Sequence, residues 1–269
     1  MTLFDEAIAL QPQPDGSFLG RTHPGYANMV GPYGGITAAQ ALNAVLQHPA
    51  RQGEPVALTV NYCAALAEGE FTALARPART NRSTQHWTVE LSQQGQAVAT
   101  ATVFTALRRD TWAADEHRMP AVPAPQQVVP SVPPTRGRVA WLERYEMRFI
   151  EGQLPDTWDG GEHHDSRTQL WMRDAPPRPL DHASLAALAD VFFPRIWRRR
   201  AKPVPVGTVS MTVYFHADTA RLQAAGAGFV LGQAQAQGFF GGYFDQTAQL
   251  WSEGGELLAT THQVVYFKE

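Results

Sequence analysis

Apolar and polar residues alternate in two distant segments of the chain that resemble each other. The first segment contains LTVNYCA (residues 58–64), and the second contains MTVYFHA (residues 211–217). In residues 207–216 one face would hold Val209, Met211, Val213 and Phe215, and the other Thr208, Ser210, Thr212 and His216. A period of two residues is typical of strands that are buried on one side. We therefore predict a half-buried strand at each segment.

A second pair of similar segments follows the first pair at comparable distances. Residues 91–103 read LSQQGQAVATATV, and residues 251–264 read WSEGGELLATTHQV. Roughly thirty residues of strand-like sequence with turn residues separate the two segments in each half. We interpret this order as a duplicated structural unit.

Each unit is predicted to begin with a helix. In the first unit Gly34 and Gly35 precede ITAAQALNAVLQH, where the polar residues Thr37, Gln40, Asn43 and Gln47 recur every three or four positions on an otherwise apolar surface. In the second unit Asp181 is a suitable N-cap for residues 182–193, and Pro194 would end that helix. Both helices should be largely covered by other parts of the protein.

A proline-rich segment separates the two halves. Residues 119–134 read MPAVPAPQQVVPSVPP, and this density of proline excludes a helix or a central strand. We predict an N-terminal unit over residues 1–118, a linker over 119–139 and a C-terminal unit over 140–269. The fold class is α+β, with two tandem units that each wrap an antiparallel sheet around a long central helix.

Composition excludes several classes of partner. The chain has 269 residues, of which 44% are hydrophobic, and a net charge of −3, so it has no concentrated positive charge for nucleic acid or anionic membranes. No apolar stretch approaches the length of a membrane span, and the N-terminus lacks the features of a signal peptide. A single cysteine, Cys63, excludes an internal disulfide framework. We expect a cytoplasmic protein without nucleic-acid binding or membrane insertion.

Asp190 is the most unusual residue of the second predicted helix, because it lies within the apolar stretch LAALADVFFPRIW (residues 185–197). Aspartate is a poor helix former and is rarely buried without a partner. A structural interpretation is that a backbone N–H or a cation such as Arg195 satisfies the carboxylate. A functional interpretation is that the carboxylate acts as a base at the rim of an apolar groove.

Six segments, taken in order, resemble the bacterial type II acyl-CoA thioesterase family, whose members are double hotdog proteins. They are GPYGGITAAQAL (31–42), GQAVATATVF (95–104), YEMRFIEG with QLWMRDAPPRPLD (145–181), LAALADVFFP (185–194), GTVSMTVYFH (207–216) and GELLATTHQ (255–263). The resemblance implies a double hotdog fold and hydrolysis of an acyl-CoA substrate to a free acid and CoA. It also implies assembly into a homo-oligomer.

The family's catalytic aspartate, threonine and glutamine correspond to Asp190, Thr208 and Gln263. By this resemblance Asp190 would accept a proton from water, while Thr208 and Gln263 orient that water toward the thioester carbonyl. No covalent intermediate, cofactor or metal is required. The candidates for stabilising the oxyanion are backbone N–H groups at Gly34 and Gly35 and in the first turn after Asp181.

Further residues are candidates for substrate binding. Arg82 and Ser83 lie in a predicted turn that resembles the family's turn at the ligand groove, and Tyr243 in GFFGGYFD could line an acyl pocket. The basic run RIWRRRAK (195–202) could bind CoA phosphates, or could be a solvated helix end. The segment EHHD (162–165) lies in a glycine-rich loop, where adjacent histidines do not readily face one ion, so we expect no metal site.

Two alternative functions remain open from the sequence. A hotdog hydratase or dehydratase would need a histidine in the groove, and His262 should point away because it is adjacent to Gln263 in a strand. A non-catalytic acyl-CoA-binding protein would keep the fold and lose turnover. The presence of Asp190, Thr208 and Gln263 together favours the thioesterase.

Overall fold

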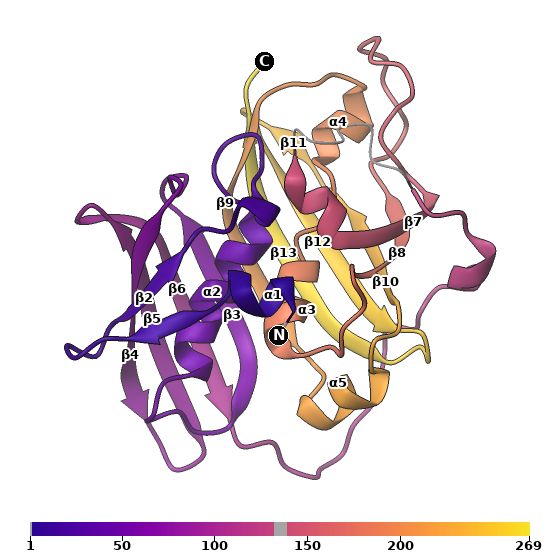
Figure 1. Cartoon of the computed structure of the whole chain (residues 1–269). Helices are drawn as coiled ribbons and strands as arrows, with labels where there is room; N and C mark the ends of the chain where they lie inside the picture. The colour runs from indigo at the N-terminus through magenta and orange to yellow at the C-terminus, as the bar shows by residue number, and fades with distance from the viewer. Residues whose placement is uncertain (1, 132–138) are drawn as a thin grey trace.

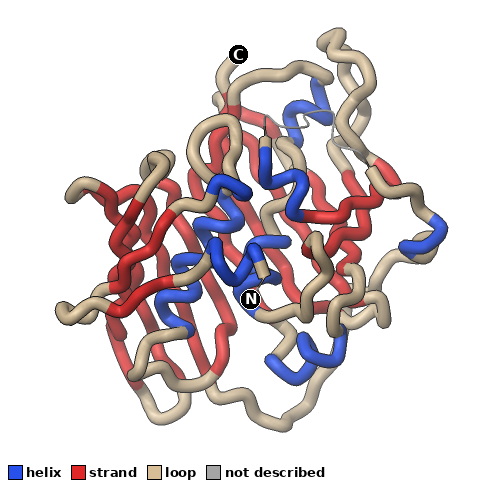
Figure 2. Tube along the Cα trace, viewed as in Figure 1, coloured by secondary structure: helices blue, strands red, loops and turns tan. Residues whose placement is uncertain are grey.

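The computed structural model describes residues 2–131 and 139–269, in which a large antiparallel sheet surrounds a few short helices (Figures 1 and 2). The sheet has thirteen strands in the order β1-β2-β4-β5-β6-β3-β9-β13-β12-β10-β8-β7, with β11 paired to β12. The strands are β1 (Leu10–Pro12), β2 (Phe18–Arg21), β3 (Glu54–Tyr62), β4 (Glu70–Thr80), β5 (Thr84–Gln93), β6 (Gln96–Ala106), β7 (Tyr145–Glu151), β8 (Thr168–Asp174), β9 (Val206–Phe215), β10 (Val230–Gln235), β11 (Phe239–Phe240), β12 (Tyr243–Ser252) and β13 (Leu257–Phe267).

Five α-helices and three short 3₁₀ turns complete the described chain. The helices are α1 (Leu3–Ala7), α2 (Gly34–Leu46), α3 (His182–Leu188), α4 (Arg195–Arg200) and α5 (Thr219–Ala225), and the 3₁₀ turns are η1 (Pro24–Tyr26), η2 (Pro125–Gln127) and η3 (Ala140–Arg144). Helices α2 and α3 pack against each other in the middle of the molecule (Figure 1). No helix in the described ranges has the length and apolar character that a membrane span requires.

The repeated segments of the sequence meet at the centre of the sheet. Strand β3 contains the first repeat and pairs antiparallel with β9, which contains the second. Thr59 and Thr212 occupy equivalent positions in the two repeats, and they lie opposite each other with their hydroxyl oxygens 3.0 Å apart. Equivalent positions of the two repeats therefore face each other where the two halves of the chain join.

Helix α2 confirms the helix predicted after Gly34 and Gly35, and its polar positions have specific partners. Gln40 and Asn43 are buried rather than solvated. The Gln40 amide donates to the Ala7 carbonyl at 2.8 Å, and the Asn43 amide donates to the Ile8 carbonyl at 2.7 Å. The polar stripe therefore binds the N-terminal segment to the helix through the two amide nitrogens, while the Gln40 amide oxygen has no partner among the described residues.

Helix α3 is shorter than the sequence predicts. Asp181 is its N-cap, as predicted, because its carboxylate accepts a hydrogen bond from the Ser184 backbone N–H at 2.8 Å. The helix ends at Leu188 instead of continuing to Pro194, and Pro194 precedes α4 rather than ending α3. Aspartate is a weak helix former and proline disfavours helical geometry in the residue before it, so the chain turns at residues 189–194. The expectation of a long central helix in both units is wrong for the second.

A β-bulge in β9 changes which side chains share a face. Register with β13 moves from Ser210 opposite Val264 to Thr208 opposite Val265, so Val209 is the extra residue. Val209 is 41% exposed, whereas Met211 is buried. The predicted alternation is therefore correct from residue 211 onward and wrong at Val209, and the bulge turns Thr208 to the same face as Met211.

The described part of the predicted linker packs on the outer face of the sheet. Met119, Val122 and Val128 cover a cluster that contains Trp171 and Trp251. The Trp171 indole donates to the Pro123 carbonyl at 2.8 Å. Residues 119–131 contain the 3₁₀ turn η2 and no strand, as proline dictates, while residues 132–138 of the predicted linker lie outside the described residues.

Candidate functional site

Asp190 lies in the turn after α3, where the chain leaves the central helix pair. The Gln263 side-chain amide, which projects from β13, donates to Asp190 Oδ1 at 2.9 Å. Gln263 is buried, whereas Asp190 is partly accessible between the buried residues Ala189 and Val191. The region around this carboxylate, between the turn after α3 and β13, is called the recess below. Two of the three catalytic candidates are in direct contact here.

The other half of the chain supplies the opposite wall of this recess. A Cβ atom added at Gly34 would lie only 2.8 Å from Asp190 Oδ2, so a larger residue would crowd the carboxylate. The backbone N–H of Gly35 donates a hydrogen bond to the same carboxylate. This N–H is at the N-terminus of α2, where free N–H groups and the helix dipole favour negative charge.

Tyr62 holds the same peptide unit from its other side. The Tyr62 hydroxyl, at the end of β3, donates to the Gly34 carbonyl at 2.9 Å. The Gly34 carbonyl and the Gly35 N–H belong to one peptide plane, so the phenol fixes the direction in which the N–H points. Chained hydrogen bonds of this kind also polarise each other. Tyr62, the Gly34–Gly35 peptide, Asp190 and Gln263 thus form one connected network.

Tyr33 holds the two central helices together next to the carboxylate. Its buried hydroxyl donates to the Ala187 carbonyl in the last turn of α3 at 2.7 Å. Its ring stacks on Trp141 with centroids 4.3 Å apart. A Cβ added at Gly35 would lie 2.5 Å from the Ala187 oxygen, so only glycine permits this approach. The N-terminus of α2 and the C-terminal end of α3 are fixed against each other at the recess.

The surroundings of Asp190 raise its pKa from 3.8 to about 7. Burial is the main cause, because removing a carboxylate from water disfavours its charged form. The hydrogen bonds from Gln263 and from the Gly35 N–H act in the opposite direction and lower the pKa. A carboxylate with a pKa near neutral pH is both available and strong enough to act as a general base.

Thr208 is near this network and does not bond to it. It lies opposite Val265 in the sheet, on the same face as Gln263 and Met211 because of the bulge at Val209. Within residues 2–131 and 139–269, no hydrogen bond joins the Thr208 hydroxyl to Asp190 or to Gln263. Thr208 therefore shares a face of the sheet with Gln263 without direct contact to Asp190 or Gln263.

Arg82 and Ser83 lie away from Asp190. They form the exposed turn between β4 and β5, and the neighbouring Gln85 amide donates to the Ala50 carbonyl beyond the C-terminus of α2. Asp190 is at the N-terminus of that helix, and 13 helical residues span roughly 20 Å. The structure does not bring these two candidates to the recess.

Tyr243 and the first turn of α3 are also separated from the carboxylate. Tyr243 follows a turn at Gly241 and Gly242 and is 51% exposed on the face of β12 opposite to the buried Phe244. It therefore points away from the face that holds Gln263. Asp181 caps the N-terminus of α3, and Asp190 follows the other end of this helix. The backbone N–H groups in the first turn of α3 therefore cannot bond to the same substrate oxygen as the Gly35 N–H. Gly34 and Gly35 are the predicted binding residues that reach Asp190.

The basic run of α4 has partners of its own. Arg195 is fully buried and donates to the Ser166 carbonyl and to the Thr168 hydroxyl, so it is a structural residue and does not contact Asp190 in the described chain. Arg199 and Arg200 lie within 3.6 Å of Glu162, and Lys202 lies 3.6 Å from Glu269. Two carboxylates thus pair with three of the five cations of this run, and the described chain shows no carboxylate paired with Arg195 or Arg198.

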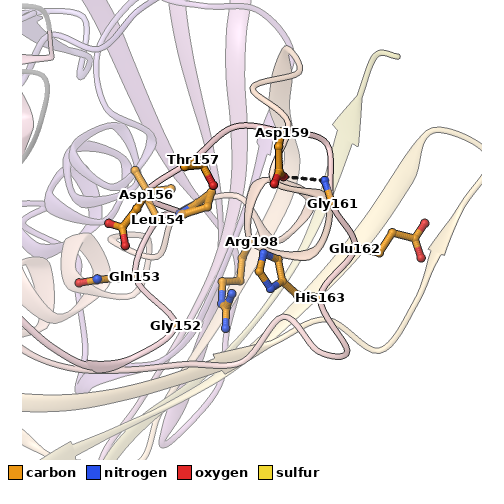
Figure 3. Close-up of a pocket in the computed structure, with 11 residues that line it drawn as sticks. Gly152, Gln153, Leu154, Asp156, Thr157, Asp159, Gly161, Glu162, His163 and Arg198 are labelled. Atoms are coloured by element: carbon orange, nitrogen blue, oxygen red, sulfur yellow. Dashed lines mark hydrogen bonds between the residues drawn. The ribbon is translucent and has the colours of Figure 1, made fainter.

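A polar cavity of about 370 Å³ opens elsewhere, in the loop between β7 and β8 (Figure 3). Arg198 and His163 lie side by side in it, with Asp156, Asp159 and Glu162 around them (Figure 3). The cavity does not include Asp190 or Gln263. Among the described residues no group of three or more histidine, cysteine, aspartate or glutamate side chains could hold a metal ion, in the EHHD segment or elsewhere.

Tyr33 and Tyr62 are site residues that sequence reasoning missed. Each had a positional signal, because Tyr33 immediately precedes the helix-opening Gly34 and Tyr62 ends the first of the repeated strands. Nothing local indicated their hydrogen bonds, which connect residues 154 and 28 positions apart in the chain.

Comparison with known proteins identifies the family. A model of the acyl-CoA thioesterase N-terminal domain matches residues 23–106, and a model of the acyl-CoA thioesterase C-terminal domain matches residues 113–267. No curated protein sequence matches the chain.

Solved structures share the fold over the whole chain. A conserved hotdog-fold protein of unknown function from Alicyclobacillus acidocaldarius is 47% identical, with a TM-score of 0.94, and the match covers 100% of this chain and 99% of that one. An acyl-CoA thioesterase II from Mycobacterium marinum is 17% identical with a TM-score of 0.74, and the match covers 98% of each chain. A tesB protein from Mycobacterium avium subspecies paratuberculosis is 18% identical with a TM-score of 0.79, covering 99% and 98% of the two chains. The chain therefore has an α+β hotdog fold, and because one domain model alone matches more than half of it, the chain belongs to the acyl-CoA thioesterase family.

Proposed function

We propose that this protein hydrolyses an acyl-CoA thioester to a carboxylic acid and CoA, with Asp190 as the general base. The observation that carries the proposal is the hydrogen bond of 2.9 Å between Gln263 and Asp190, in a recess at the N-terminus of α2. A carboxylate in this position has a raised pKa and two fixed hydrogen-bond donors.

In the proposed reaction a water molecule between Asp190 and the thioester attacks the carbonyl carbon. The Asp190 carboxylate accepts a proton from that water as the carbon–oxygen bond forms, and the former carbonyl oxygen becomes an oxyanion. The N-terminus of α2 supplies backbone N–H groups and a favourable dipole beside this oxygen. When the carbon–sulfur bond breaks, the CoA sulfur takes the proton back and the free acid leaves.

Gln263 and Thr208 have different roles in this proposal. Gln263 holds the carboxylate in one orientation, which keeps its second oxygen directed at the water. Thr208 shares a face with Gln263 and contributes a hydroxyl that bonds to the water rather than to the two protein side chains. The roles of Thr208 and Gln263 come from the family resemblance, and their common face supports them.

We also infer that the fold consists of two tandem hotdog units. The strand order supports this inference, because the strands of the second half follow β9 as those of the first half precede β3. Each half then contributes to one recess, with Gly34, Gly35 and Tyr62 from the first and Asp190 and Gln263 from the second.

A hydratase or dehydratase has less support than a thioesterase. His262 is exposed on the outer face of β13, where its ring lies 3.4 Å from an Asp245 oxygen, and the adjacent Gln263 is buried on the inner face. The recess thus has no histidine to pair with Asp190 among the described neighbours. A non-catalytic binding protein would not need a base tuned to neutral pH.

The test is a thiol-release assay on purified protein with acyl-CoA esters of short to long chain and with phenylacyl esters. We expect hydrolysis of at least one ester, and a loss of about 100-fold or more in kcat for Asp190→Asn. Asp174→Asn is a matched control, because Asp174 is also buried and has a pKa raised to about 6 by burial, yet it bonds to Ser184 and not to this network. Equal activity of the parent and Asp190→Asn would exclude the proposed base.

A further inference from the structure

The polar cavity of about 370 Å³ lies between α4 and the loop that joins β7 to β8 (Figure 3). Its lining residues come from the loop 152–163 and from α4, which contributes Arg198. Its volume is at the small end of the range for ligand sites, so the cavity suits a small molecule. The proposed hydrolysis uses none of these residues, because Asp190 and Gln263 lie outside the cavity.

Contacts between the loop and α4 hold the walls of the cavity in place. The His163 backbone N–H donates to the Arg199 carbonyl at 2.9 Å. The Trp158 ring packs edge-on against Trp197, with ring centroids 6.1 Å apart. At the start of the loop Gly152 has a φ of +70°, and a Cβ atom there would collide with the backbone just before β8. The cavity is therefore preformed, which reduces the entropy that a ligand loses on binding.

Arg198 is the cation of the basic run that faces the cavity, and no carboxylate of the described chain pairs with it. Its buried Nε–H also lacks a hydrogen-bond acceptor, whereas Arg199 and Arg200 pair with Glu162. A buried donor without an acceptor is unfavourable, and the planar guanidinium matches a carboxylate in shape and charge. His163 lies beside Arg198, and its ring can donate to the same group (Figure 3). The cavity therefore favours an anionic oxygen group next to Arg198.

Carboxylates of the protein line the same cavity and select among anions. Asp156 is exposed, and it pairs with no cation within residues 2–131 and 139–269. Asp159 accepts from the Gly161 backbone N–H at 2.8 Å and has no cation partner in the same ranges. These carboxylates would repel a doubly charged phosphate and attract an ammonium group. A small ligand that carries both a carboxylate and an ammonium group can pair with both signs of charge at once.

We propose that this cavity binds a small zwitterion, an α-amino acid, whose carboxylate bonds to Arg198 and His163 and whose ammonium group lies beside Asp156. Gln153 and Thr157 also line the cavity and offer an amide and a hydroxyl to the side chain of the ligand. Amino acids with polar side chains should therefore bind best. The site is separate from Asp190, and its existence does not depend on the proposed hydrolysis.

The experiment measures the thermal midpoint of the parent with each of the common amino acids at millimolar concentration, followed by titration calorimetry for any that raise the midpoint. Acetate, methylammonium and inorganic phosphate are probes that carry charge of one sign only. We expect at least one polar amino acid to bind, and each of these three probes to bind at least about tenfold more weakly.

Variants test which residues hold the ligand. Arg198→Gln should weaken binding of that amino acid about tenfold or more, and Asp156→Asn should weaken it about two- to fivefold because Asp156 is exposed. Arg221→Gln is the matched control, because Arg221 lies on another short helix, α5, outside the cavity lining, and it should keep the parent Kd.

Three results would overturn the assignment. They are the absence of binding by every amino acid, an unchanged Kd in Arg198→Gln, and binding of acetate or phosphate as tight as that of the best amino acid. The last result would make the cavity a general anion site. If Arg198→Gln does not fold, an unchanged Kd in Asp156→Asn rejects the zwitterion instead. Thiol release is not part of the readout, so the result holds whether or not the protein hydrolyses acyl-CoA.

Discussion

At the scale of single residues, the environment of Asp190 opposes stability and favours reactivity. Its pKa of about 7 in the folded protein exceeds the ordinary value of 3.8, so the folded state binds this proton more tightly than the unfolded state does. The stabilisation from that proton is complete below pH 4 and is lost as pH rises through 7. At neutral pH, where catalysis needs the charged base, desolvation of that charge therefore lowers the free energy of unfolding.

The variant Asp190→Asn should be more stable than the parent at neutral and alkaline pH. Asparagine keeps an oxygen that can accept from Gln263 and carries no charge to desolvate. The difference in thermal midpoint should grow between pH 4 and pH 7 and stay constant above that range. Unfolding curves at pH 4.5, 6 and 8 measure it, and a difference that does not depend on pH would show that the carboxylate is not destabilised in the folded state.

The variant Tyr62→Phe should reduce activity through Asp190. Without the phenol, the Gly34 carbonyl loses its donor and the Gly35 N–H is less well directed at the carboxylate. We expect kcat/KM at pH 7 to fall roughly 2–10-fold, which corresponds to one hydrogen bond, and the acidic limb of the pH profile to move upward. Tyr145→Phe is the control, because the buried Tyr145 hydroxyl has no partner among the described residues. If the acidic limb of the pH profile stays at the parent position, Tyr62 does not act on the pKa of Asp190 and has only a packing role.

At the scale of elements, the site depends on where two helices end. The N-terminus of α2 meets the C-terminal end of α3, and the Tyr33 hydroxyl joins them. Helix α3 has only seven residues, so its position depends on its caps more than that of a long helix would. The Asp181 cap also bonds to Arg178, which links it to Asp5 in α1.

The variant Asp181→Ala should therefore lower both stability and activity. Loss of the N-cap should reduce the free energy of unfolding by about 1 kcal/mol in denaturant titrations. Asp218 caps α5 in the same way, through the Arg221 N–H at 2.8 Å, and α5 lies away from the recess. Asp218→Ala should show the loss that belongs to a cap alone, because Asp181 also bonds to Arg178, and it should leave thiol release unchanged. Equal activity in the two variants would show that the α3 cap does not affect the position of Asp190.

The elements that could be predicted from sequence are those with local causes. Helix α2 follows from its apolar run after two glycines, and the Asp181 cap follows from the residue type. The end of α3 was missed because the periodic apolar pattern continues through Val191 and Phe192, although the chain has already turned. The bulge at Val209 was missed because it exists only in the pairing with β13.

The same distinction applies to the site. Asp190 and Gln263 could be named from the resemblance, and the apolar surroundings of Asp190 made it conspicuous. Their 2.9 Å contact joins residues 73 positions apart, and no local pattern specifies it. Arg82 and Tyr243 were plausible by residue type. The sequence does not show that the turn with Arg82 lies near the C-terminus of α2, and it does not show that Tyr243 points outward, because both depend on the register of the sheet.

At the scale of the whole molecule, the two halves are joined in three ways. Strands β3 and β9 make the sheet continuous, the two central helices pack together, and residues 119–128 cross the outer face of the second half. The recess contains residues from both halves, so the packing of the two halves against each other also sets the positions of Asp190, Gln263 and the N-terminus of α2.

The variant Trp171→Phe should loosen the crossing segment without affecting the site. It removes the hydrogen bond to the Pro123 carbonyl and keeps most of the aromatic packing with Trp251. We expect faster hydrogen–deuterium exchange in residues 119–128, with thiol release within about twofold of the parent. Exchange at the parent rate would show that packing alone holds the segment to the sheet.

The pH dependence of kcat/KM tests the central claim most directly, because it reports the ionisation of the free enzyme's base. With an acyl-CoA ester that the parent hydrolyses, kcat/KM should rise tenfold per pH unit on the acidic side and level off above a midpoint of about 7. Asp190→Asn should show only a low residual rate without this limb, while Asp174→Asn should retain it. A parent midpoint near 4, or a limb that persists in Asp190→Asn, would contradict the assignment of Asp190 as the base.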